Sequence, residues 1–327
     1  MSWNSVRGCG ARLDQPGSFR HGYVIRKKVA RWRKRAARWD CDCLYDTFDR
    51  YSWSFSCKSL GIKGETFEDS CQVLDQLQAK LRRAVRAQDN DAAAAACLAV
   101  LEWGGVQARN GQWIEKNRER LIHILEHDRC LLCMSSPTTE SLGRLHRFNA
   151  GMVKLYSLLL DDFIIYDGRV GAALGLLTRE WCLSTGRACV PDLLRFPWGK
   201  PKEEKDADQP KNRNPSTDGL RFPALRPQPK GAAFHALWTI RASWLLQATL
   251  TENDSRFREA ACPLRAFEAA LFMIGYDLGG GKGANDRSGN PQREERSEGT
   301  RHAREASKSM VQTHLKFAHR PSTTPRK

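Results

Sequence analysis

The sequence predicts a mainly α-helical protein, and two of its features support this fold class. Apolar residues recur every three or four positions in several segments, which is the spacing of one face of a helix. Clusters of glycine, proline and small polar residues separate these segments and are typical of helix ends. The chain has 327 residues, of which 41% are hydrophobic. That is enough to bury a core, and we expect roughly eight to ten helices.

The chain is strongly basic, with a formal net charge of +16, which makes a polyanion the expected partner. It has neither a run of eighteen apolar residues nor a signal-peptide core, so we expect a cytoplasmic, nucleoid-associated protein that does not enter membranes. The eleven cysteines are scattered and odd in number, which favours reduced thiols. Zinc at Cys130-x-x-Cys133 or Cys41-x-Cys43 stays an alternative, but neither pair has a second pair or a histidine at suitable spacing. We therefore expect no metal and no cofactor.

Residues 1–40 are expected to form a basic N-terminal segment with a helix over 23–39. The apolar positions that predict this helix are Ile25, Val29, Trp32, Ala36 and Trp39. The stretch contains no acidic residue, and its basic residues include Arg26, Lys27, Lys28, Arg31 and Arg35. We favour contact with nucleic-acid phosphates, which gains from counterion release. A solvated basic face and a membrane-surface helix are the alternatives.

Residues 41–280 are expected to form the helical domain, and its first half contains several separate helices. Tyr51, Trp53 and Phe55 alternate as in a strand or a capped loop. We predict helices from Thr66, as N-cap, to Val85, and from a cap at Asn90 or Asp91 to Leu101. Further helices are predicted over 113–127 and 139–147, with Pro137 between them. Residues 104–112 are expected to be a loop.

Trp103 and Trp113 flank this expected loop. They could stack on a base turned out of a duplex, or simply pack in the core of a helix connection. The sequence does not distinguish these two interpretations.

The stretch from Leu145 to Leu177 carries the chemistry that we consider most informative. It contains an Asn/Gly turn, an apolar run with Lys154 near its start, a break at two aspartates, and Asp167. After Asp167, apolar residues follow helical spacing and predict a helix over 170–183. Lys154 and Asp167 are thirteen residues apart, each near the expected start of a helix. An amine and a carboxylate could therefore meet in one cleft.

The remainder of the chain contains a polar insert, two helices and a tail. Eight prolines lie within 190–231, so we expect a long polar insert at 195–231, anchored at 196–198 and 222–223. Helices are predicted over 234–250 and 264–278. Residues 281–327 lose apolar periodicity and are expected to form a disordered basic tail.

The turn, the lysine-bearing helix, the break and the Tyr166-Asp167-Gly168-Arg169-Val170 run resemble the core of the helix-hairpin-helix DNA glycosylases, closest to the 8-oxoguanine-glycosylase-like branch. The hairpin here carries one glycine, Gly151, where that family usually has two. The resemblance implies a multi-helix fold with two lobes and a cleft. It also implies that Lys154 attacks the sugar C1′ while Asp167 supports the reaction.

This resemblance predicts a monomeric DNA glycosylase, with or without AP-lyase activity, acting on double-stranded DNA that carries a damaged or modified base. The hairpin amides would present partial positive charge to a phosphate. The expected DNA-binding residues around it are Arg144, Arg147, Asn149, Gly151 and Arg169. The alternative is a non-catalytic helical protein that binds nucleic acid, and a membrane-surface or partner-binding protein is a third possibility.

Overall fold

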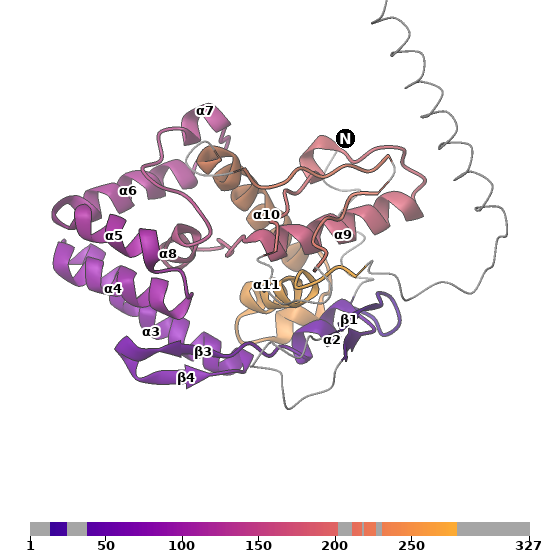
Figure 1. Cartoon of the computed structure of the whole chain (residues 1–327), viewed down its shortest axis with the longest axis horizontal. Coiled ribbons are helices and arrows are strands. Elements are labelled where there is room, and N and C mark those ends of the chain that lie inside the picture. The colour runs from indigo at the N-terminus through magenta and orange to yellow at the C-terminus, as the bar shows by residue number, and fades with distance from the viewer. Residues whose placement is uncertain (1–13, 25–37, 202–210, 218, 227–230, 280–327) are drawn as a thin grey trace, which may run out of the picture. The chain divides into compact units, whose positions relative to one another are not determined.

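The computed structural model describes residues 14–24, 38–201, 211–217, 219–226 and 231–279 (Figure 1). The described residues belong to one compact unit, and the expected basic tail lies outside them. The described part contains ten α-helices and little sheet, which confirms the prediction of a mainly α-helical fold. None of its helices combines the length and apolar character needed to cross a membrane.

The N-terminal part contains two small antiparallel sheets. Strands β1 (His21–Val24) and β2 (Arg38–Cys41) pair with Tyr23 opposite Trp39, and these two rings stack with centroids 4.8 Å apart. The helix expected over 23–39 is therefore wrong at both ends, because a cross-strand aromatic pair takes the place of a helical face. Residues 25–37, with Arg26, Lys27, Lys28, Arg31 and Arg35, lie outside the described residues.

Helix α2 (Leu44–Asp49) follows β2 and leads to the second sheet. Strand β3 (Phe55–Cys57), the 3-10 helix η2 (Lys58–Leu60) and strand β4 (Ile62–Gly64) form a hairpin. Gly61 ends η2 with φ of 68°, a left-handed conformation that glycine adopts without strain. Of the two alternatives for Tyr51 to Phe55, the strand begins only at Phe55, and the residues before it form a loop.

Helices α3 (Phe67–Arg86) and α4 (Asn90–Trp103) agree with the prediction. Thr66 caps α3 in a capping box, accepting from the Asp69 amide while Asp69 accepts from the Thr66 amide. The cap of α4 is Asp89 rather than Asn90 or Asp91, because the Asp89 side chain accepts from the Ala92 amide.

The next helices differ from the prediction in their bounds. They are α5 (Ala108–Lys116), η3 (Arg118–Arg120), α6 (Leu121–Leu132), α7 (Thr139–Leu142) and α8 (Met152–Leu159). Helix α5 occupies much of the expected loop. The helix expected over 113–127 breaks at Asn117, whose side chain donates to the Trp113 carbonyl at 2.8 Å and so competes with the helical backbone. The helix expected over 139–147 ends at Leu142, because Gly143 is its C-cap.

Three helices lie in the part of the chain after residue 167. They are α9 (Gly168–Ser184), α10 (Ala232–Glu252) and α11 (Pro263–Ile274), with the 3-10 helices η4 (Asp192–Leu194) and η5 (Arg256–Glu259) between them. The ends of the polar insert are anchored as predicted. The Trp198 amide donates to the Pro223 carbonyl at 3.0 Å, while Phe196 and Phe222 are buried.

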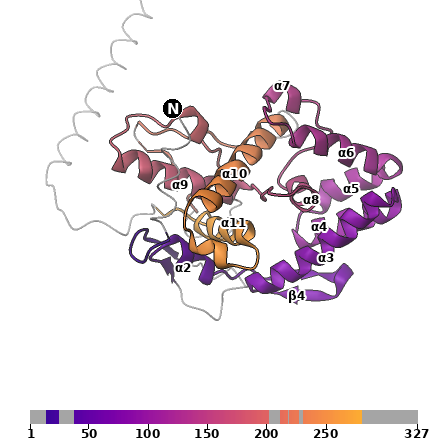
Figure 2. The same ribbon diagram turned by 180° about the vertical axis from the view of Figure 1, so that it is seen from behind.

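The buried apolar side chains form two clusters. One combines α9 and α11 with β1, β2 and α2, and the other combines α3 to α8. Figures 1 and 2 show these two groups of helices from opposite sides, with α10 passing from one to the other. Accordingly, α10 contributes Trp238 and Leu245 to the first cluster and Leu237 and Ile240 to the second.

Candidate functional site

Lys154 lies in the first turn of α8, as predicted. The loop of residues 143–151, between α7 and α8 and called the hairpin below, is held by the side chain of Asn149. Its Oδ1 accepts from the backbone amides of Gly151 at 2.8 Å and Met152 at 3.0 Å, and its Nδ2 donates to the side-chain oxygen of Asn110 at 3.0 Å. This network fixes the start of α8 and therefore the position from which the lysine extends.

Asp167 is the N-cap of α9, also as predicted. Its Oδ1 accepts from the amides of Arg169 at 2.8 Å and Val170 at 3.1 Å. Helices α10 and α11 hold the extended chain that leads to it. The Ile164 amide donates to Ser243 of α10 at 3.1 Å, and the Ile165 amide donates to Glu268 of α11 at 2.8 Å.

Lys154 and Asp167 line the same pocket, whose volume is about 550 Å³. Residues from both apolar clusters form its walls, including Phe67 and Phe272 of the first and Phe55 and Leu74 of the second. The structure thus places this amine and this carboxylate in the lining of one cavity, an arrangement that the sequence allowed. The two side chains reach this pocket because α8, α9 and α11 pack around it.

The charges in the pocket perturb one another. Burial lowers the pKa of the Lys154 amine, while the carboxylates of Asp167 and Glu268 raise it and Arg169 lowers it further. The amine donates to the Ala150 carbonyl at 3.3 Å. Burial also raises the pKa of Glu268 to about 7, against the opposing effect of its hydrogen bond from Ile165. Lys154, a weaker base than an ordinary lysine, and Glu268, a weaker acid than an ordinary glutamic acid, thus share one pocket.

Arg169 lies in the pocket wall rather than on an open surface. Its guanidinium carbon is 4.1 Å from the centre of the Trp53 ring and 4.3 Å from that of Phe272. Burial lowers the pKa of Arg169 to about 10, and its buried Nη1 has no hydrogen-bond partner among the described residues. An unpaired buried donor is costly.

The two tryptophans expected at a base pocket separate in the structure. Trp103, at the end of α4, lines the pocket, and its buried Nε1 finds no hydrogen-bond partner within the described part of the chain. Trp113 on α5 is not among the lining residues, and its ring lies 5.7 Å from the guanidinium of Arg147. Trp113 therefore supports the hairpin from outside the pocket.

The other residues expected to bind DNA lie around the hairpin. Arg144 is exposed, and its Nε donates to the Ser141 carbonyl at 3.3 Å. Arg147 donates to Asn110 at 3.0 Å, so it braces the hairpin, and Gly151 is buried. Cys130 and Cys133 are exposed free thiols at the end of α6.

Sequence reasoning missed Glu268 and Phe272 as pocket residues, and for Trp53 it favoured packing in the core over stacking on a base. Glu268 has a visible signal, since it is an acid within the apolar run of α11. Such a residue is rarely buried unless paired or functional. Trp53 and Phe272 have none, because an aromatic residue in a core and one in a pocket wall look alike in sequence.

No family model matches the sequence, and neither a curated protein nor a solved structure shows a match to this chain. The geometry and chemistry of the pocket are therefore the basis for a functional assignment.

Proposed function

We propose that the protein is a DNA glycosylase in which Lys154 and Asp167 act together on a base that has been turned out of the duplex. The observation that carries this proposal is their convergence. A lysine with a lowered pKa and a helix-capping aspartate open into one aromatic-walled pocket. Residue types of this kind suit the breaking of an N-glycosidic bond, which builds positive charge on the sugar.

Lys154 would act as the nucleophile in its neutral form. Its nitrogen lone pair would form a bond to the sugar C1′ while the bond from C1′ to the base breaks, and the base would leave with that electron pair. Loss of the amine proton and opening of the sugar ring would then give an imine. Burial lowers the pKa of Lys154, which enlarges the neutral fraction that this step requires.

The two carboxyl groups would have different tasks. Asp167 would stabilise the positive charge that develops on the sugar. With a pKa of about 7, Glu268 carries its proton in part of the molecules at neutral pH. It would give that proton to the departing base, a general-acid role for which a pKa near the working pH is favourable.

The pocket would hold the flipped base and part of its nucleotide. Trp53, Trp103 and Phe272 offer aromatic surface to a base. Six lining residues are cationic and two are acidic, an excess that suits a phosphate at the pocket mouth. The cations are Lys154, Arg169, Lys200, Lys211, Arg213 and Arg265.

The same proposal interprets the fold as a helix-hairpin-helix arrangement. The hairpin of residues 143–151 leads into α8, and the two apolar clusters would be the two lobes on either side of the pocket. Phosphates of double-stranded DNA would contact the hairpin, exposed Arg144 and the basic residues between β1 and β2.

Borohydride trapping on a panel of duplexes with different modified bases tests the proposal. Reduction converts an imine into a permanent protein–DNA crosslink, and only an amine forms an imine. Lys154→Ala should abolish the crosslink and strand cleavage. Lys200→Ala and Lys211→Ala are matched controls, because these two lysines line the same pocket, and both variants should retain trapping.

Each other outcome has a defined meaning. Trapping that persists in Lys154→Ala and disappears in Lys211→Ala would assign the chemistry to a different amine. Base release without trapping would indicate a hydrolase in which Asp167 acts through water. DNA binding without base release on any duplex would favour a non-catalytic nucleic-acid-binding protein, which the net charge of +16 also suits.

A further inference from the structure

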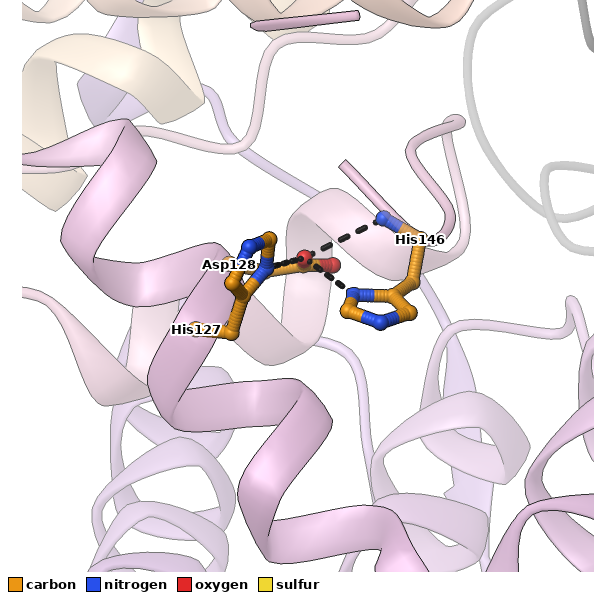
Figure 3. A group of neighbouring side chains, drawn as sticks. All are labelled: His127, Asp128 and His146. Carbon is orange, nitrogen blue, oxygen red and sulfur yellow. Dashed lines mark hydrogen bonds and ion pairs between the residues drawn. The ribbon is translucent and has the colours of Figure 1, made fainter. Parts of the chain in front are cut away.

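Two histidines and an aspartate meet at a second place, away from the pocket. His127 and Asp128 are neighbours on α6, and His146 lies in the hairpin that precedes α8 (Figure 3). One ligand atom from each residue lies within 4.8 Å of the others. None of the three lines the pocket, so the proposed base chemistry leaves this cluster unexplained.

The cluster converges on one oxygen atom. Asp128 Oδ1 lies 2.8 Å from His146 Nδ1, 3.1 Å from His127 Nδ1 and 3.1 Å from the backbone nitrogen of His146. The other carboxylate oxygen accepts from the Tyr156 hydroxyl at 2.6 Å. Asp128 itself is completely buried, whereas the two imidazoles are about one-third exposed, at 37% and 31%.

Four donors surround the Asp128 carboxylate, three of them at Oδ1, and a carboxylate offers about four lone-pair sites. Two of these donors are imidazole nitrogens, which become metal ligands when they lose their protons. Among the described residues, the ion-pair partners of Asp128 are these two histidines, with no lysine or arginine. A buried carboxylate is costly unless a cation or a full set of donors compensates it. A cation bound by the two Nδ1 atoms and Oδ1 would take over that compensation from the two imidazole donors.

We propose that His127, Asp128 and His146 form a binding site for a divalent transition-metal ion of the Zn²⁺ type. Imidazole nitrogen and carboxylate oxygen are typical zinc ligands. Ligand atoms about 2.1 Å from a tetrahedral ion are roughly 3.4 Å apart, close to the nitrogen–oxygen distances of 2.8 and 3.1 Å found here. The two nitrogen–oxygen pairs would open by a few tenths of an ångström, and the two imidazole nitrogens, which lie within 4.8 Å of each other, would adjust toward the same spacing. The partial exposure of both imidazoles gives them room to move, and water would complete the coordination.

The outer contacts are those that a metal ligand needs. The His146 amide and the Tyr156 hydroxyl each hold one oxygen of the Asp128 carboxylate, which fixes the direction of that ligand. An ion at this position would tie α6 to the hairpin that leads into α8. Tyr156 is two residues beyond Lys154 on α8, so the ion would steady the helix that carries the lysine without touching the pocket.

Calorimetric titration of the full-length, tag-free protein with Zn²⁺, after removal of metal by a chelator, tests the site. The unmodified protein should bind one ion, and His127→Ala and His146→Ala should each weaken binding at least about tenfold. Even loss of an outer contact of a metal ligand costs that much. His123→Ala is the matched control, since His123 is exposed one turn earlier on the same helix, and it should bind as the unmodified protein does.

The exposed thiols Cys130 and Cys133 require a second control. Cys130→Ser/Cys133→Ser should leave the affinity unchanged, and Co²⁺ in place of Zn²⁺ should show no thiolate absorption band. The histidine variants avoid buried Asp128, and circular dichroism checks that they fold. Three results would overturn the site: no Zn²⁺ binding by the unmodified protein, equal binding by His127→Ala/His146→Ala, or loss of binding in the cysteine variant.

Discussion

Glu268→Gln isolates the energetic cost of placing a carboxylate in the pocket wall. Glutamine keeps an acceptor for the Ile165 amide, which donates to Glu268 at 2.8 Å, but it carries no charge. Burial raises the pKa of Glu268 from 4.5 to about 7, so the folded protein holds this proton over a pH range in which the unfolded chain releases it. At about 1.4 kcal/mol per pH unit, this difference corresponds to roughly 3 kcal/mol.

Proton binding determines whether the free energy of unfolding rises or falls with pH. Because the pKa is raised in the folded state, the stabilising contribution of the protonated form is complete below about pH 4.5 and is lost as the pH rises through about 7. Relative to Glu268→Gln, the free energy of unfolding of the unmodified protein should therefore fall by roughly 3 kcal/mol between about pH 4 and pH 8. Glutamine should stabilise the protein most at alkaline pH.

Urea unfolding at about pH 4.5, 6, 7 and 8.5 measures this difference for the two proteins. Glu119→Gln is the control, since Glu119 is exposed and its replacement should leave stability close to that of the unmodified protein at every pH. If the difference in free energy of unfolding between Glu268→Gln and the unmodified protein does not vary with pH, the reasoning is refuted. So would a gain in the relative stability of the unmodified protein as the pH rises, since that trend belongs to an ion-paired carboxylate.

Three other variants test the pocket and its surroundings. Asp167→Asn should keep the melting temperature and DNA affinity, because asparagine also caps helices, while base release falls by orders of magnitude; full activity in the folded variant would exclude a catalytic role. Gly104→Ala would place a Cβ 2.5 Å from Lys154 Cδ, so it should slow imine trapping by displacing the lysine. Gly111→Ala is its control, since its Cβ would meet only Leu98 at 3.4 Å, and equal rates would show that the lysine position is unimportant. Replacing the basic residues between β1 and β2 by glutamine should make the salt dependence of DNA affinity shallower, by roughly one log unit for each phosphate that the protein no longer neutralises, and an unchanged slope would place the phosphate-binding residues elsewhere. The residues to replace are Arg26, Lys27, Lys28, Arg31 and Arg35.

Local patterns in the sequence were sufficient to predict most helices and the placement of Lys154 and Asp167. The apolar spacing of α3, α9 and α10 identifies each helix within a few residues of its observed bounds, because burial of one face repeats along the chain. Asp167 caps α9 through hydrogen bonds to residues two and three positions ahead. A local interaction of this kind is visible in a short stretch of sequence.

The remaining features depend on contacts between distant residues. Trp39 fits a helical stripe in sequence and Tyr23 begins the same expected helix, yet the two residues belong to paired strands, where their rings stack and Tyr23 contacts Tyr276. Glu268 is about one hundred residues from Ile165, to which it is bonded. Local periodicity contains no information about such pairs, so it could not show that α11 supplies the second carboxyl group of the pocket.

Helix α10 has a consequence for how the protein unfolds. It contributes buried residues to both apolar clusters along a single continuous helix of 21 residues. Loss of either cluster would expose one face of this helix to water and remove the support that it gives to the other cluster. The two halves are therefore coupled in cooperative unfolding, and a state with one half intact and the other melted is disfavoured. Because the pocket wall draws on both halves, its shape persists only while the whole unit is folded.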